Sequence, residues 1–238
     1  MGALLFCEEK IKKTELYKCS FLSGDAWIIE ESSTESTAPI ELETNSSIPE
    51  NSSLHTRTGT LCELVNGTQL IRIGSTSRLH FENNSTVNIS GGSMLISFNE
   101  STEFEIQSEL SSIKTQGRFT AIVECTSNGG FKFIPLEGKG KIIPQTGEQK
   151  DIYRGRLTMV LGSPSKLGNA YDIDLLLLLK SSRLINSFPT PLPTMKRISL
   201  AVYAQQLKLK GKFNALIGDA PTDDNLQMWA FGKEDSKE

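Results

Sequence analysis

The residue types that most often carry catalysis are few in this chain, and they are scattered. His55 lies in a polar segment, and His80 lies between Leu79 and Phe81, where the alternation of side chains along a strand turns it outward. Neither histidine has an acid or a cysteine at a spacing typical of a catalytic or metal-binding group. We therefore interpret both, the only histidines in the sequence, as surface or structural residues, which leaves no candidate for the commonest general base or metal ligand.

Short motifs of known chemistry are absent as well. The sequence contains no GxSxG nucleophile elbow, no GxxxxGK(S/T) phosphate loop and no GxGxxG fingerprint. We interpret Gly138-Lys139-Gly140 as a hairpin bend rather than a phosphate-binding loop. The acidic stretch 218–224 lacks the ligand spacing of an EF-hand, so its aspartates are interpreted as helix caps. The sequence predicts no catalytic, cofactor-binding or metal-binding residue.

One pair of carboxylates keeps an enzymatic hypothesis open. Glu103 and Glu105 alternate with Phe104 and Ile106, so both lie on one face of a predicted strand. Paired carboxylates can act as acid and base, as in glycoside hydrolysis. The same alternation is typical of the solvated face of a strand, and no other feature supports a reaction. We therefore predict that the protein is not an enzyme.

The cysteines are Cys7, Cys19, Cys62 and Cys125, and an even number allows two disulfides. Their spacing is loose, the chain is not small, and no CxxC pair indicates zinc. We expect mostly unpaired thiols. If a disulfide exists, Cys62 and Cys125 are the first pair to test, because both lie on predicted strands.

The elements that must position these residues are strands. Apolar residues alternate with polar ones between residues 61 and 161, for example at 94, 96 and 98, and turn residues interrupt them at short intervals. On a strand, this spacing buries one face and exposes the other. Many short strands joined by tight turns predict a mainly β fold, an antiparallel β-sandwich or β-roll. Asn66-Gly67 and Asn128-Gly129, each between two such runs, predict two-residue hairpins.

Composition divides the chain into three regions. We expect an N-terminal lead over 1–20, with a helix or extended arm at 10–17, then a β domain over 21–165 and a smaller helical region over 166–238. Pro135 and Pro144 are expected at sheet edges or strand ends. The expected strands are 21–30, 61–73 as one hairpin, 78–81, 86–89, 94–98, 103–107, 112–115, 119–125, 131–136, 139–143, 149–153 and 156–161, followed by a loop over 162–169 and helices over 173–188, 196–209 and 222–231.

Charge and hydropathy restrict the class of partner. The 238 residues carry 28 acidic and 25 basic side chains, and this net charge of −3 argues against nucleic acid. The longest apolar run, at 173–179, is far shorter than the ~20 residues that cross a bilayer, so we expect no membrane span. The start, MGALLFC, is too short for a signal peptide, so we expect either no export by this route or a true start further upstream.

Several segments together resemble one known family. GDAWI begins at Gly24, and LHTRTGTLCELVNGTQLIRIGSTSRLHF follows at 54–81. Three further segments come in order: ISGGSMLISF, SSIKTQGRFTAIV and FKFIPLEGKGKIIPQTGEQKDIYRGRLTMV. Their succession of glycine steps, an Asn-Gly turn and apolar strands resembles the FecR-type domain of bacteria over 24–161.

The resemblance to FecR-type domains implies a non-enzymatic, extracytoplasmic β domain that binds another protein, such as an envelope or membrane component acting as receptor or regulator. It implies a periplasmic or otherwise extracytoplasmic location. No segment resembles the sigma-factor-binding region or membrane helix of the best-known members, and the helical region 166–238 is additional. The alternative is a carbohydrate- or ligand-binding β-sandwich with two exposed aromatics on a concave face, although Trp27 and Trp229 are expected in the core.

Overall fold

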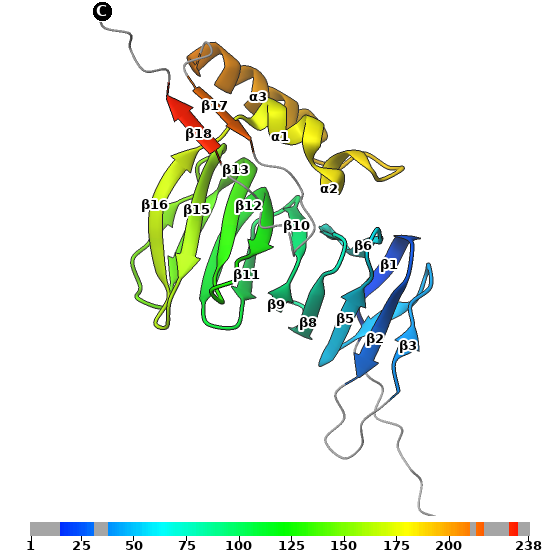
Figure 1. Cartoon of the computed structure of the whole chain (residues 1–238). Helices are drawn as coiled ribbons and strands as arrows, with labels where there is room; N and C mark the ends of the chain where they lie inside the picture. The colour runs from blue at the N-terminus through cyan, green and yellow to red at the C-terminus, as the bar shows by residue number, and fades with distance from the viewer. Residues whose placement is uncertain (1–14, 31–37, 210–212, 217–228, 233–238) are drawn as a thin grey trace, which may run out of the picture.

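Most of the chain folds into one large, curled β-sheet with helices on one side (Figure 1). The structure is a computed structural model and describes residues 15–30, 38–209, 213–216 and 229–232. Sixteen strands form the large sheet, and β17 (Phe213–Leu216) pairs with β18 (Trp229–Gly232) in a separate two-stranded ribbon. The predicted mainly β fold with a few C-terminal helices is confirmed.

The strands of the large sheet follow one another with short connections. They are β1 (Glu15–Ser23), β2 (Ala26–Glu30), β3 (Ile40–Glu41), β4 (Ser47–Pro49), β5 (Ser52–Thr56), β6 (Leu61–Asn66), β7 (Gln69–Ile73), β8 (Arg78–Asn83), β9 (Thr86–Gly91), β10 (Ser93–Phe98), β11 (Thr102–Gln107), β12 (Ser112–Cys125), β13 (Phe131–Pro144), β14 (Lys150–Asp151), β15 (Arg156–Leu161) and β16 (Lys166–Asp172).

The sheet has two halves that share β12. One half pairs in the order β3-β2-β5-β8-β9-β11-β12, and the other in the order β4-β1-β6-β7-β10-β12. The two halves meet at β12 because two strands pair with successive parts of it: β11 pairs with residues 112–117, and β10 pairs with residues 120–124. The opposite side of β12 pairs along its whole length with β13, and β15 and β16 continue from there. Only the β9–β11 pair is parallel among these described strands.

Three glycines lie where β12 and β13 pass from one half of the sheet to the other. Gly117 pairs with Gly140, and Gly138 pairs with Phe119. The φ of Gly138 is 112°, and a Cβ atom there would lie 2.4 Å from the carbonyl oxygen of Arg118. Only glycine fits such a backbone approach. The predicted hairpin bend at Gly138–Gly140 is therefore wrong, because pairing with β12 continues through this segment and keeps it inside β13.

A first hydrophobic core lies between the two halves of the sheet. Its centre is a chain of phenylalanine rings in which Phe98 contacts Phe104 and Phe119, and Phe119 contacts Phe133. Ring centroids lie 5.1, 5.3 and 5.9 Å apart, the spacing of offset and edge-to-face pairs. Each phenylalanine is the inward residue of its strand, so this core is what the period-two pattern predicts.

A second core lies on the outer face of the sheet, under α1 (Leu175–Ser181), α2 (Arg183–Asn186) and α3 (Met195–Leu209). Strands β7, β10, β12, β13 and β15 are therefore buried on both faces, and all six residues of β10 are buried. The prediction of one wet face is wrong for these strands, because several of their alternate positions are also apolar and the helices cover that face. The second core includes Leu70, Leu95, Ile122, Ile134, Leu136 and Leu157 from the sheet and Leu175, Leu178, Leu184, Ile198 and Val202 from the helices.

A buried arginine ties the helical layer to the sheet. Arg72 of β7 is fully buried, and its Nε donates to Glu63 Oε2 of β6 at 2.9 Å. Its Nη atoms donate to the carbonyl oxygens of Leu184, Ile185 and Thr190. The guanidinium also lies 4.2 Å from the ring centre of Phe188. One side chain thus satisfies carbonyls of α2 and of the segment that follows it.

A second polar link lies near the start of α3. Arg197 Nε donates to Glu137 Oε2 of β13 at 2.8 Å. Thr120 of β12 donates to the other oxygen of Glu137 at 2.8 Å, and its hydroxyl also contacts Thr194 Oγ1. Thr120, Glu137 and Thr194 are buried, and each is hydrogen-bonded, as burial requires. The two links fix both ends of the segment that joins α2 to α3.

Two predictions near the ends of the β domain are wrong. Residues 15–23, expected in the lead and at the start of a strand over 21–30, form β1, and Gly24 separates it from β2. Residues 166–172, expected to begin in a loop, form β16. In β16, polar and small residues stand where a hydrophobic pattern needs apolar ones, and pairing with β15 decides the structure instead. In β1, Tyr17, Cys19 and Phe21 do alternate with Lys18 and Ser20, and the strand pairs with β6.

The helix predictions are partly confirmed. The helix expected over 196–209 is α3. The one expected over 173–188 begins later, with Asp174 as its N-cap, and divides at Ser182 into α1 and α2. Most of the helix expected over 222–231 lies outside the described residues, and its described end belongs to strand β18.

The two predicted hairpins exist, with different loops. Asn66 pairs with Gln69, so the two-residue loop is Gly67-Thr68, and Gly67 alone has a positive φ, 57°. A turn of type II′ needs a positive φ only at its first position. Asn128-Gly129 lies in a five-residue loop over 126–130 between β12 and β13. Pro144 ends β13 as predicted, but Pro135 lies inside it, at a register shift.

Gly138→Ala tests the glycine contacts between β12 and β13. The new Cβ meets backbone atoms of β12, and the φ is unfavourable, so we expect a loss of about 3 kcal/mol in the free energy of unfolding. Gly59→Ala is the matched control, because its φ is 83° but nothing lies within 4 Å of the added Cβ. It should cost only about 1 kcal/mol. Urea unfolding measures both, and equal losses would contradict a tight crossing.

Arg72→Met tests the buried link to the helices. The substitution leaves Glu63 buried without its guanidinium partner, so we expect a loss of about 3–5 kcal/mol. The double variant Arg72→Met, Glu63→Leu should recover most of that loss. Arg57→Met is the control, because its ion pair with Asp25 is exposed and should contribute about 0.5 kcal/mol or less. Thermal unfolding of the four proteins checks the order, and an Arg72→Met protein as stable as Arg57→Met would refute the link.

Candidate functional site

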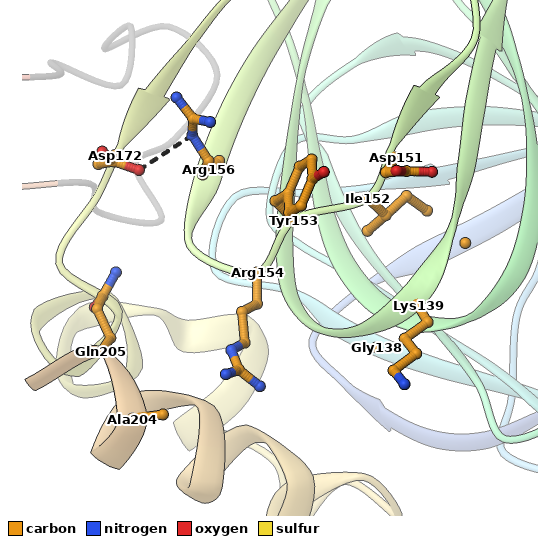
Figure 2. Close-up of a pocket in the computed structure, with 11 residues that line it drawn as sticks. Gly138, Lys139, Asp151, Ile152, Tyr153, Arg154, Arg156, Asp172, Ala204 and Gln205 are labelled. Atoms are coloured by element: carbon orange, nitrogen blue, oxygen red, sulfur yellow. Dashed lines mark ion pairs between the residues drawn. The ribbon is translucent and has the colours of Figure 1, made fainter. Parts of the chain in front are cut away.

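A large cavity lies between α3 and the segment that joins β14 to β15; we call it the α3 cleft (Figure 2). Its volume is about 660 Å³. Residues from three parts of the chain meet there, from β13, from the β14–β15 connection with β16, and from α3. The lining residues are Gly138, Lys139, Gly140, Asp151, Ile152, Tyr153, Arg154, Arg156, Asp172, Ala204 and Gln205.

Backbone hydrogen bonds hold one wall of the α3 cleft against β13. The amide of Ile152 donates to the carbonyl of Gly140, and that of Gly155 donates to the carbonyl of Pro135, each at 2.8 Å. Ile152 itself is buried in the first core. Tyr153 and Arg154 lie between these two anchors and are exposed. The ring of Tyr153 and the guanidinium of Arg154 are therefore exposed on a backbone segment that hydrogen bonds hold at both ends.

Gln205 of α3 forms the other fixed point of the cleft. Its Oε1 accepts from the amide of Leu175 at 2.9 Å, and its Nε2 donates to the carbonyl of Ile173 at 2.6 Å. Leu175 is the first residue of α1, where helix amides lack an intrahelical partner. One side chain thus caps α1 and holds α3 beside it. The position of α3 along the cleft follows from this contact.

The charges of the α3 cleft separate into a paired and an unpaired group. Arg156 Nε lies 3.2 Å from Asp172 Oδ1, and both side chains are about half exposed. Lys139 and Arg154 extend together in another direction, away from Asp172 and Asp151 (Figure 2). No carboxylate lines the cleft near the tips of these two cations in the part of the chain that the structure describes. That side of the cleft is positive, although the chain as a whole is negative.

An exposed apolar stripe on α3 borders the cleft. Leu200, Tyr203 and Leu207 are 64%, 62% and 57% exposed. Their spacing of three and four residues places them on one helix face. Ala204, which lines the cleft, adjoins this face, while Ile198, Ala201 and Val202 are buried against the sheet. The helix therefore presents apolar residues on both sides, of which only one is covered by the described residues.

The two glutamates considered for catalysis line a smaller groove of about 290 Å³ beside β11 and β12. Glu103 Oε1 accepts from Gln116 Nε2 at 3.1 Å, and Glu105 lies 4.0 Å from Lys114 Nζ. Each carboxylate thus has a polar neighbour on β12. The arrangement is that of a solvated strand face with cross-strand pairs.

The structure brings the two histidines closer than the sequence indicates. In the pairing of β5 with β8, His55 lies opposite Arg78, and His80 lies opposite Ser53, so both histidines share one sheet face. His80 Nδ1 lies 3.1 Å from Ser53 Oγ. Burial, with a smaller effect of Arg78, lowers the pKa of His55. Within the described ranges, no three His, Cys, Asp or Glu side chains gather closely enough to hold a metal ion.

The structure places Cys62 beside Cys19 and not beside Cys125, the residue with which a disulfide was to be tested first. Cys62 Sγ lies 4.0 Å from Cys19 Sγ. Cys125 Sγ instead donates to the carbonyl of Ile89, and burial raises its pKa to about 12. The Cys62–Cys125 pair is therefore wrong, because strand pairing places β1 next to β6. Cys7 lies outside the described residues.

Comparison with known proteins finds no family model that matches the chain. No curated protein matches its sequence significantly. The resemblance to FecR-type domains stays a prediction that rests on the motifs themselves. Among the described helices, none has the length and apolar character needed to cross a membrane.

Gln205→Ala tests how α3 is positioned. Loss of the side chain leaves the Leu175 amide and the Ile173 carbonyl without their partner, so we expect a cost of about 1–2 kcal/mol. Hydrogen exchange at the Leu175 amide should accelerate at least about tenfold. Gln206→Ala is the control, because its amide only approaches Asp174 at 3.5 Å on the surface. Unchanged exchange at Leu175 in Gln205→Ala would contradict this role.

Proposed function

We propose that this protein is a non-enzymatic, extracytoplasmic domain of FecR type that binds another protein in signalling or scaffolding. We further propose that the contact surface is the α3 cleft together with the stripe of Leu200, Tyr203 and Leu207. The single observation that carries the proposal is this stripe. Three large apolar side chains, each more than half exposed on one helix, are unusual for a surface that contacts only water.

The chemistry of the surface favours an acidic, apolar segment as the partner. Aliphatic and aromatic side chains of a partner would cover the α3 stripe, as an amphipathic segment covers a helix face. Lys139 and Arg154 lie free of carboxylates at the adjoining side of the cleft and would attract acidic groups. Arginine beside an exposed tyrosine, here Tyr153, is a composition enriched at protein interfaces.

Strand addition is the less suitable mode of binding. The open edges of the described sheet are β3 and β14 with two residues each, β4 with three and β16 with seven. Thr158 and Val160 of β15, two positions apart, pair with Ala170 and Leu167 of β16, which are three positions apart. Strand β16 therefore contains a bulge. Short strands and bulges hinder pairing with a further strand. The helix surface is therefore favoured over an edge.

Site-specific photocrosslinking tests the proposed surface. A benzoylphenylalanine in place of Tyr203 should give a discrete crosslinked protein in the cells that produce the chain. The same probe in place of Leu110, which is 50% exposed in the loop between β11 and β12, should not give that product. Crosslinking at both positions to the same proteins, or at neither, would refute the surface.

Charge reversal tests the chemistry of the partner. Arg154→Glu should reduce the yield of the Tyr203-dependent crosslink at least about tenfold, because it replaces attraction with repulsion of an acidic segment. Lys166→Glu makes the same change of charge on β16, outside the cleft, and should leave the yield unchanged. Equal effects of the two variants would indicate unspecific electrostatics and contradict a defined acidic contact.

A carbohydrate-binding module is the second candidate. The observation that favours it is the exposed ring of Tyr153 in a cavity large enough for a sugar unit. Tyr153 is, however, the one aromatic residue that lines the α3 cleft, and Trp27 is half-buried beside His55 on another strand. Binding on a glycan array that is lost in Tyr153→Ala would favour this candidate over protein binding.

A further inference from the structure

Two buried sulfur atoms lie in contact within the first core. Cys19 of β1 and Cys62 of β6 are fully buried, and their Sγ atoms lie 4.0 Å apart. Both side chains point inward, from neighbouring antiparallel strands. In this reduced arrangement, the contact with the Cys62 thiol lowers the pKa of Cys19. The proposed function uses neither residue.

Strand register explains why these two cysteines meet. Cys19 pairs with Leu64, and Leu22 pairs with Cys62, with a register shift between Cys19 and Phe21. The cysteines are therefore diagonal neighbours on the same face of the two strands, where side chains are within reach of each other. A disulfide needs sulfurs about 2.05 Å apart. Rotation of two short side chains from a contact of 4.0 Å is a small change compared with a movement of strands.

We propose that Cys19 and Cys62 form an intramolecular disulfide when the chain folds under oxidising conditions. Such a bond would link β1, whose only other described strand partner is β4, to the centre of its half of the sheet. The link spans 43 positions of the sequence and closes a loop that includes β2 to β5. The N-terminal strand would then be held covalently as well as by hydrogen bonds.

The reaction is an exchange with an external disulfide, such as oxidised glutathione. The thiolate of one cysteine attacks the external disulfide, forms a mixed disulfide and releases one external thiolate. The thiolate of the second cysteine then attacks the protein sulfur of the mixed disulfide, which forms the Cys19–Cys62 bond and releases the second external thiolate. Two electrons pass from the cysteines to the external disulfide, and the two protons end on its thiols.

Burial determines when the exchange takes place. Neither sulfur is exposed in the folded protein, so an external disulfide of the size of glutathione cannot reach them there. The bond must form before β1 completes its packing, while the thiols are accessible. After folding, the same burial protects it from reductants. Refolding therefore tests the proposal, whereas treatment of the folded reduced protein does not.

Peptide mapping after refolding identifies the bond. The full chain is unfolded in urea with dithiothreitol, refolded in a glutathione redox buffer, alkylated and digested with trypsin. Cys19 lies in the tryptic peptide 19–57 and Cys62 in 58–72, whereas Cys7 and Cys125 lie in 1–10 and 119–132. We expect 19–57 and 58–72 to be joined, with two hydrogens fewer than the sum of the free peptides. Free, alkylated Cys19 and Cys62 in the refolded protein would overturn the proposal.

Variants distinguish the specific bond from unspecific oxidation. Cys125→Ser should keep the link, and Cys62→Ser should abolish it without creating another major linked pair. The melting temperature of the linked protein should exceed that of the same protein refolded with dithiothreitol by about 5–15 °C, and this difference should vanish in Cys62→Ser. A Cys62–Cys125 link, or a linked protein no more stable than the reduced one, would contradict the proposal. The outcome is independent of any partner at the α3 cleft.

Discussion

A fully buried guanidinium constrains how α2 and the segment that follows it lie on the sheet. A charge without water is tolerated only when each of its donors finds an acceptor. Arg72 finds a carboxylate on β6 and backbone carbonyls at and beyond α2. The helices are thus located on the sheet by polar geometry, while the second core supplies apolar burial beneath them. The position of α3, and with it the shape of the α3 cleft, follows from this arrangement.

The curled sheet depends in a similar way on the glycines of β12 and β13. Both halves of the sheet share β12, and β13 pairs along it, so the two strands approach each other closely where Gly117, Gly138 and Gly140 lie. Lys139 lies between two of them and faces outward into the α3 cleft. The same local sequence that allows the strands to cross therefore also presents one of the two unpaired cations. Architecture and candidate site share these few residues.

The sequence predicts most of the strands and α3, because hydrophobic periodicity is a local signal. It fails where long-range contacts decide. Ser97 and Thr120 have the spacing of solvated residues, yet helices from the far end of the chain cover them and Thr194 completes their hydrogen bonds. Strand β16 has no apolar alternation and forms because β15 is available to pair with it. The α3 cleft combines residues separated by up to about seventy positions, and no local motif indicates that Lys139, Arg154 and Ala204 meet.

The burial of five strands on both faces has a consequence for synthesis of the protein. The segments that cover Leu95, Ile122 and Ile134 come from residues 175–202, near the end of the chain. While the ribosome is still synthesising these helices, the sheet residues that they will cover form a broad exposed apolar surface. Helices of seven and four residues cannot persist alone, so the cover must assemble on a sheet that already exists. This face of the nascent sheet therefore stays uncovered until residues 175–202 have emerged.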